Sequence, residues 1–89
     1  MMHIGRVVLA KAGRDRGKSF VIVGVIDEEY VLIANGTNRS IDKPKRKKIR
    51  HLTAQPDVLE IIKEKIIKNQ KIFDAEIRKS LESLIYDEK

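Results

Sequence analysis

Apolar residues in the first half of the chain fall into short runs that are rich in β-branched side chains. The runs cover residues 7–10, 20–26 and 30–34, and polar residues bound each of them. Runs of this length and composition favour extended strands over helices. The pattern therefore predicts three strands, and Gly24 inside the second run predicts a bulge.

Turn-forming residues separate these runs. Residues 13–18, with two glycines four positions apart, predict a tight loop, and residues 27–29 predict a hairpin turn. Asn-Gly at residues 35–36 opens a further polar stretch. Beyond it, strand-like alternation over residues 41–52 is interrupted by Pro44, which belongs on a sheet edge or in a loop. Four to five short strands without an intervening helix predict a small β-barrel rather than a sandwich.

The hydrophobic spacing becomes helical after residue 53. Pro56 and Asp57 predict the start of a first helix, residues 69–71 predict its end, and Asp74 is placed to cap a second helix. The predicted apolar stripes consist of Val58, Leu59, Ile62 and Ile66 on the first helix, and Ile77, Leu81, Leu84 and Ile85 on the second.

We therefore expect a mainly β unit over residues 1–53, followed by an amphipathic α-helical extension over residues 54–89. A barrel of about fifty residues is marginally stable without further cover. The two short helices are accordingly expected to pack on the barrel. A leftover apolar stripe on the second helix could instead contact another protein or form a homodimer.

The composition argues against an enzyme. A chain of 89 residues has room for one domain and little apolar material for a deep substrate pocket. The absence of cysteine excludes disulfides and thiolate metal sites, and it fits a cytoplasmic location. No run approaches the roughly 18 apolar residues that span a bilayer, so no membrane association is expected. No residue pattern indicates an activated nucleophile, and we predict no catalytic residue, cofactor, metal site or small-molecule substrate.

Positive charge is concentrated in the first half of the chain. Residues 1–53 hold twelve Lys or Arg against five Asp or Glu, a net charge of +7, whereas residues 54–89 hold seven against eight, a net charge of −1. Six cations within residues 43–50 would repel one another without a polyanion, and they are Lys43, Lys45, Arg46, Lys47, Lys48 and Arg50. A second cluster lies on residues 11–18, hereafter the glycine loop, and consists of Lys11, Arg14, Arg16 and Lys18. Two such clusters on one barrel favour polyanion binding over a merely solvated charged surface.

Two parts of the sequence resemble a known family. Residues 5–8, 12–18 and 21–23 resemble the KOW motif of ribosomal and transcription-elongation proteins. Residues 44–52, Pro-Lys-Arg-Lys-Lys-Ile-Arg-His-Leu, resemble the basic strand of the large-subunit ribosomal protein 14e group and its bacterial relatives. The resemblance implies an SH3-like barrel whose basic loops contact structured RNA, above all ribosomal RNA. It implies RNA contacts by the four cations of the glycine loop and by Lys45, Arg46, Lys47, Lys48 and Arg50.

The charge pattern and the resemblance together predict a non-catalytic RNA-binding protein that associates with ribosomal RNA or the ribosome through phosphate contacts. Asn35, Asn38 or Arg39 could add contacts to bases or to 2′-hydroxyl groups. The hypothesis requires the two basic clusters to lie on a common side of the barrel and not to be neutralised by the protein's own carboxylates. Two other functions stay open: a protein-interaction adaptor that uses the barrel or the helices, and a duplex-DNA-binding protein.

Overall fold

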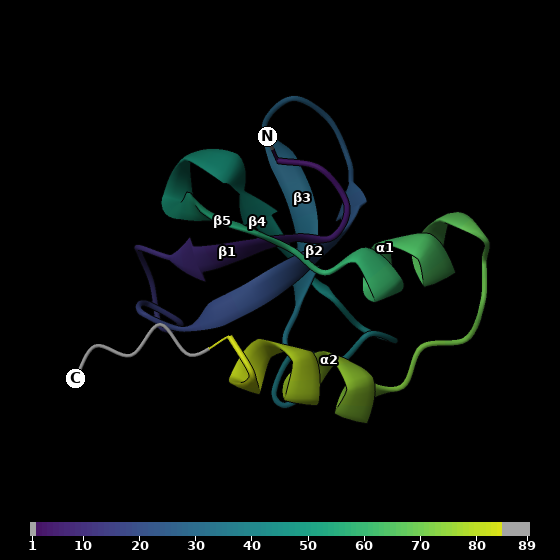
Figure 1. Ribbon diagram of the computed structural model, residues 1–89. Helices are drawn as coiled ribbons and strands as arrows, with labels where there is room; N and C mark the ends of the chain where they lie inside the picture. The colour runs from purple at the N-terminus through teal and green to yellow at the C-terminus, as the bar shows by residue number, and fades with distance from the viewer. Residues whose placement is uncertain (1, 85–89) are drawn as a thin grey trace.

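Five β-strands and then two α-helices make up the computed structural model, which describes residues 2–84 (Figure 1). The strands are β1 (Arg6–Ala10), β2 (Ser19–Val25), β3 (Tyr30–Ala34), β4 (Lys45–Lys48) and β5 (Leu52–Val58). The 3-10 turn η1 (Ile49–His51) joins β4 to β5, and the helices are α1 (Glu60–Ile67) and α2 (Asp74–Glu82).

The predicted mainly β fold with a helical tail is confirmed. Ile85, which the sequence placed on the second helix, lies outside the described residues. No helix in the described part of the chain is long and apolar enough to cross a membrane.

The strands form one antiparallel sheet in the order β4-β3-β2-β1-β5. The predicted bulge is confirmed, because the pairing of β2 with β3 shifts its register between Ile22 and Gly24. A second irregularity lies between Arg6 and Val8, where β1 pairs with β5. Bulges increase the local twist and bend of a strand, which lets short strands curl into a small SH3-like barrel.

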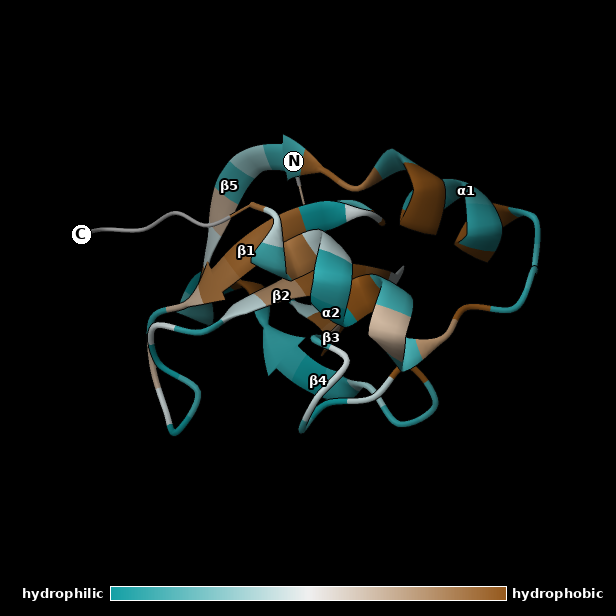
Figure 2. Cartoon of the chain, turned by 60° about the horizontal axis from the view of Figure 1, so that its bottom comes forward, coloured by the Kyte–Doolittle hydropathy of each residue, from teal (hydrophilic) through white to brown (hydrophobic). Residues whose placement is uncertain are grey.

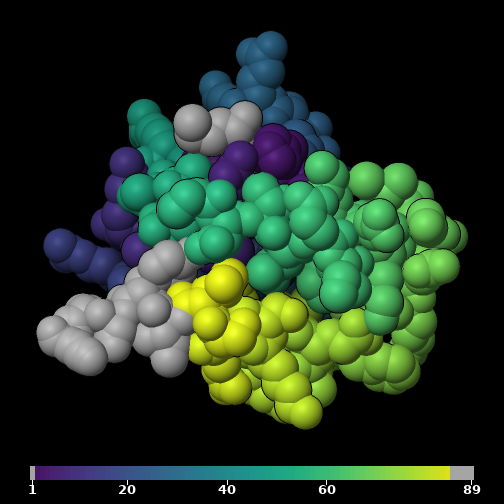
Figure 3. Space-filling model, viewed as in Figure 1, coloured from purple at the N-terminus to yellow at the C-terminus, as the bar shows by residue number. Residues whose placement is uncertain are grey.

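Apolar side chains are buried on both faces of the sheet. The inner face forms the barrel core, which consists of Val8, Ala10, Phe20, Ile22, Val31, Ile33 and Leu52. On the outer face, Val21 and Ala34 form a second core with Ile62 of α1, Ile77 of α2 and Ile72 between the helices. The two helices lie next to each other over this face (Figures 1 and 3). Burial on both sides explains why β2 is apolar along most of its length.

The first helix begins later than predicted. Pro56 and Asp57, which predicted a helix start, belong to β5, and α1 begins at Glu60. The prediction is wrong because β5 continues its pairing with β1 as far as Val58, opposite Arg6. This long-range pairing outweighs the local signal for a helix cap. Since β5 has a hydrogen-bonded neighbour on one side only, a proline is tolerated there.

Helix α2 holds the loop between β3 and β4, residues 35–44, in place. Asp74 does not cap the helix as predicted; it is the first helical residue, and its carboxylate accepts a hydrogen bond from the Ile41 N–H at 2.7 Å. Arg78 Nη1 donates to the Gly36 carbonyl at 3.2 Å. Gly36 has a φ of +79°, and a Cβ atom at this position would collide with the main-chain oxygen of Asp74. Glycine is therefore required where the loop meets the helix.

Candidate nucleic-acid interface

The basic segment of residues 43–50 divides between the two faces of the sheet, because side chains alternate along β4. Lys45 and Lys47 pair with residues of β3 that belong to the barrel core, so they point to the inner side. Lys45 Nζ lies 3.6 Å from the Asp15 carboxylate, and Lys47 Nζ donates to the main-chain carbonyl of Ala12 at 3.3 Å. These two lysines therefore meet the glycine loop.

Arg46 and Lys48 lie on the opposite, outer face of β4. The Arg46 guanidinium is 4.5 Å from the centre of the Tyr30 ring, and Lys48 Nζ is 5.9 Å from it. These distances are typical of cation–π contacts. Figure 2 shows β4 as hydrophilic along its length, in contrast to the apolar β1. Two cations of the segment are thus directed away from the glycine loop.

Asp15 lies at the centre of the inner-side cations. Its side chain is only 3% exposed, and its carboxylate lies 3.5 Å from Arg39 Nη2, 3.6 Å from Lys45 Nζ and 4.0 Å from Lys18 Nζ. Burial by itself raises the pKa of this carboxyl, but the charges of Arg39 and Lys45, with hydrogen bonds from Asn38 and Arg39, hold it below its ordinary value. We call these residues, Asp15, Lys18, Arg39 and Lys45, the Asp15 cluster. One carboxylate thus gathers cations from the glycine loop, the β3–β4 loop and β4.

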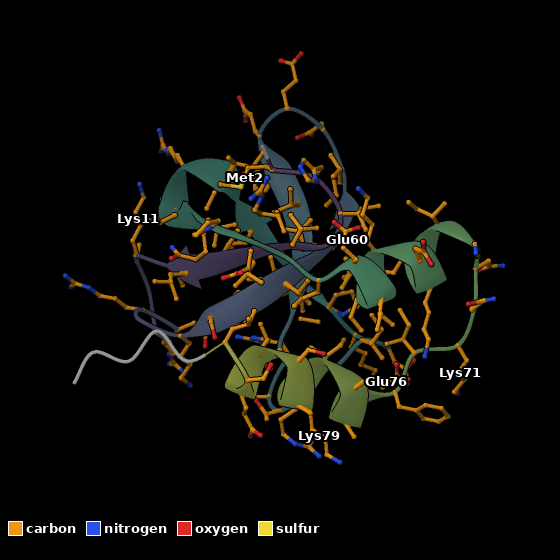
Figure 4. All side chains as sticks on the ribbon, viewed as in Figure 1. Met2, Lys11, Glu60, Lys71, Glu76 and Lys79 are labelled. Atoms are coloured by element: carbon orange, nitrogen blue, oxygen red, sulfur yellow. The ribbon has the colours of Figure 1, made fainter. Side chains whose placement is uncertain are left out.

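The cluster keeps an excess of positive charge, since three cations share one carboxylate. Further predicted contact residues are exposed and form no ion pair with a carboxylate of residues 2–84; they are Lys11, Arg14, Arg16, Lys43 and Arg50. Lys11 projects outward from the end of β1 (Figure 4).

The pKa of His51 is lowered by desolvation and then by the charges of Arg50, Lys47, Lys48 and Lys11. Nowhere in the described chain do three or more His, Cys, Asp or Glu side chains gather to hold a metal ion.

The polar residues predicted on the β3–β4 loop hydrogen-bond to one another. Asn35 Oδ1 accepts from the Thr37 and Arg39 N–H groups, both at 3.0 Å. The Asn35 amide donates to Asn38 Oδ1 at 2.9 Å. These bonds shape the loop that carries Arg39 to Asp15.

Asp15 is absent from the predicted site residues because its partners Arg39 and Lys45 are distant in the sequence. One local signal does point to it. Asp15 is the single acidic residue of the glycine loop and stands between Arg14 and Arg16. The two glycines of the loop have φ values of +85° and +86°, which lets the chain turn tightly around a side chain that points inward.

Curated relatives identify the family, although no protein-family model matches the chain. The large ribosomal subunit protein eL14 of Hyperthermus butylicus is 33% identical over 81 residues, which are 91% of this chain and 76% of that protein. The eL14 protein of Pyrobaculum calidifontis is 31% identical over 83 residues, or 93% of this chain and 74% of that protein. For Staphylothermus marinus eL14 the identity is 35% over 60 residues, and the match spans 62% of that protein. The chain therefore belongs to the family of large ribosomal subunit protein eL14, the 14e group that its glycine loop and basic strand resemble.

Proposed function

We propose that this chain is a non-catalytic RNA-binding protein that attaches to structured ribosomal RNA through the glycine loop, Arg39, Lys45 and Lys47. The relatives are named as proteins of the large ribosomal subunit, which supports a place on or near ribosomal RNA. One observation carries the proposal: cations from three separate segments converge around Asp15 and outnumber it. A cytoplasmic location belongs to the same proposal.

The chemistry of the surface fits a sugar-phosphate chain. Lysine and arginine that replace the condensed counterions of a nucleic acid gain the entropy of counterion release. Lys11, Arg14 and Arg16 are exposed on the glycine loop, which also carries Asp15, and the half-buried Lys47 donates to the Ala12 carbonyl of the same loop. The scarcity of exposed aromatic residues argues for recognition of folded RNA by shape and phosphate position rather than by base stacking.

Two double variants on β4 test the proposed face. Lys45→Gln with Lys47→Gln removes two charges from the inner side, and Arg46→Gln with Lys48→Gln removes two charges from the outer side of the same strand. We expect the inner pair to weaken binding to protein-free large-subunit ribosomal RNA by about tenfold or more, and to reduce the salt slope by roughly 0.7 to 0.9 for each phosphate that is no longer neutralised. The outer pair should have a much smaller effect, because its side chains contact Tyr30.

Circular dichroism and melting temperatures would establish that both double variants are folded. Equal binding by the inner pair, the outer pair and the parent protein would reject the proposed face.

A competitor duplex DNA of equal length separates RNA from DNA recognition, because a DNA-binding protein would be displaced as readily by either. Co-sedimentation with large ribosomal subunits before and after nuclease treatment separates RNA binding from a protein adaptor. Nothing in the described residues favours the homodimer considered from the sequence, and it is not part of the proposal.

A further inference from the structure

A basic hollow lies where the glycine loop, the β3–β4 loop and α2 meet. It has a volume of about 360 Å³ and opens to solvent. Its polar lining consists of Lys18, Ser19, Asn35, Thr37, Arg78 and Glu82. Two cations therefore stand in the walls of one hollow, Lys18 on the barrel and Arg78 on the helix.

Arg78 is held in a defined position. Its Nη1 atom donates to the Gly36 carbonyl at 3.2 Å, and its side chain is half-buried. The helix that carries it is itself fixed, because Ile77 is fully buried in the outer core and Asp74 accepts the Ile41 N–H. A guanidinium has five N–H donors, so a single hydrogen bond to a carbonyl leaves donors for an anion.

The hollow continues the surface built around the Asp15 cluster. Lys18 lines the hollow and also lies 4.0 Å from the Asp15 carboxylate. Thr37 and Asn35 belong to the hydrogen-bonded loop that brings Arg39 to the same carboxylate. An RNA strand that crosses the glycine loop therefore reaches the hollow without leaving the basic surface.

We propose that this hollow binds one sugar-phosphate unit of the RNA, with the phosphate between Lys18 and Arg78 and the ribose hydroxyl against the hydroxyl groups of Ser19 and Thr37. Charge-assisted bonds from guanidinium and ammonium groups to phosphate oxygens are the strong contacts at such sites. Glu82 lines the same hollow, and its carboxylate lowers the affinity for a phosphate. The inference rests on the proposed function, and it makes α2 part of the RNA surface as well as a cover for the sheet.

Neighbouring residues on α2 supply a matched test. Arg78→Gln removes the charge but keeps an amide that can donate to the Gly36 carbonyl, and Lys79→Gln removes one charge from the adjacent, exposed position (Figure 4). We expect Arg78→Gln to weaken binding to protein-free large-subunit ribosomal RNA by about five- to twentyfold. Its salt slope should fall by roughly 0.7 to 0.9, the value of one phosphate contact. Lys79→Gln should change affinity by less than about twofold, because Lys79 is exposed, does not line the hollow and is screened by salt.

Glu82→Gln gives an independent readout that does not depend on the stability of the Arg78 variant. We expect it to tighten RNA binding at low salt, whereas Glu60→Gln, at an exposed position of α1, should not. Equal affinity and equal salt slope for Arg78→Gln and Lys79→Gln would overturn the inference, and so would equal affinity for the Glu82 and Glu60 variants. When the parent protein binds RNA and the inner β4 double variant does not, equal results for the α2 variants and their controls reject the α2 site alone. Failure of the parent protein to bind would reject the proposed function as a whole.

Discussion

Replacing Asp15 with Asn separates two explanations of the basic surface. Asparagine has nearly the same size, but it lacks the charge that Lys18, Arg39 and Lys45 share. The change also raises the net charge of the chain from +6 to +7. If attraction of phosphate depended on charge alone, the variant would bind RNA more tightly.

The structure predicts that the variant is less stable. Loss of a buried, hydrogen-bonded carboxylate costs several kcal/mol when its partners are also buried. Here the three cations have side chains that are 55%, 32% and 31% exposed, so water can solvate them once the carboxylate is gone. We therefore expect a loss of about 1 to 3 kcal/mol in the free energy of unfolding. For a domain of this size, that lowers the melting temperature by roughly 4 to 8 °C for each kcal/mol.

The same variant should bind RNA more weakly in spite of its extra positive charge. Immobilising a flexible side chain at an interface costs about 0.5 to 1.5 kcal/mol, and the Asp15 carboxylate orders Arg39 and Lys45 before RNA arrives. Removal of a negative charge from the surface offsets part of this loss. A net effect of about 1 kcal/mol corresponds to roughly fivefold weaker binding.

Fluorescence anisotropy with protein-free large-subunit ribosomal RNA, titrated at several salt concentrations, measures this effect. The matched control is Asp42→Asn, which makes the same change in net charge at an exposed position of the β3–β4 loop. We expect Asp42→Asn to bind slightly more tightly than the parent protein. The reasoning fails if Asp15→Asn remains folded at the assay temperature and binds as tightly as the Asp42 variant.

Three further predictions concern the loop, acid stability and His51. Gly36→Ala should lower the free energy of unfolding by about 2 to 4 kcal/mol in urea denaturation, because the left-handed backbone and the Asp74 oxygen leave no room for a Cβ. The pKa values of Asp15 and Glu76 are lowered from 3.8 and 4.5, the second chiefly by the hydrogen bond from Lys65. These two carboxylates therefore stabilise the fold above their ordinary pKa values, and the stabilisation is lost as the pH falls below those values. The urea concentration at the unfolding midpoint should decrease once the pH is below about 4.5, and it should decrease less in Asp15→Asn. The pKa of His51 lies below 6.5 in the free protein and should rise when RNA phosphates neutralise its cationic neighbours, which an NMR titration with and without RNA would measure.

The sequence predicted the features that depend on local conformation. The first three strands, the glycine loop and the bulge at Gly24 follow from apolar runs and glycine positions, and the structure contains all of them. The strand-like alternation over residues 41–52 corresponds instead to β4, the 3-10 turn Ile49–His51 and the start of β5. The start of α1 was mispredicted because Pro56 and Asp57 carry a local helix signal, whereas their conformation is set by pairing with β1.

The arrangement of the site was harder to predict, because it depends on register and on long-range contacts. Six cations within eight residues indicate a basic segment, but only the register of β4 with β3 reveals that Lys45 faces the inner side and Arg46 the outer side. Asp15 and Arg39 are 24 residues apart, and Arg78 and Gly36 are 42 residues apart. Local patterns contain no information about contacts of this range.

The position of β4 at the end of the sheet order has a consequence for the behaviour of the free protein. A strand with a neighbour on one side only presents backbone groups that can recruit a strand from another molecule. Four consecutive cations on β4 oppose such recruitment, because a second copy aligned along this strand would bring like charges together. The lysines proposed to attract RNA thus also keep copies of the protein apart. A polyanion bound along β4 would neutralise these charges. It would also cover the strand, and so physically block its pairing with a second copy of the protein.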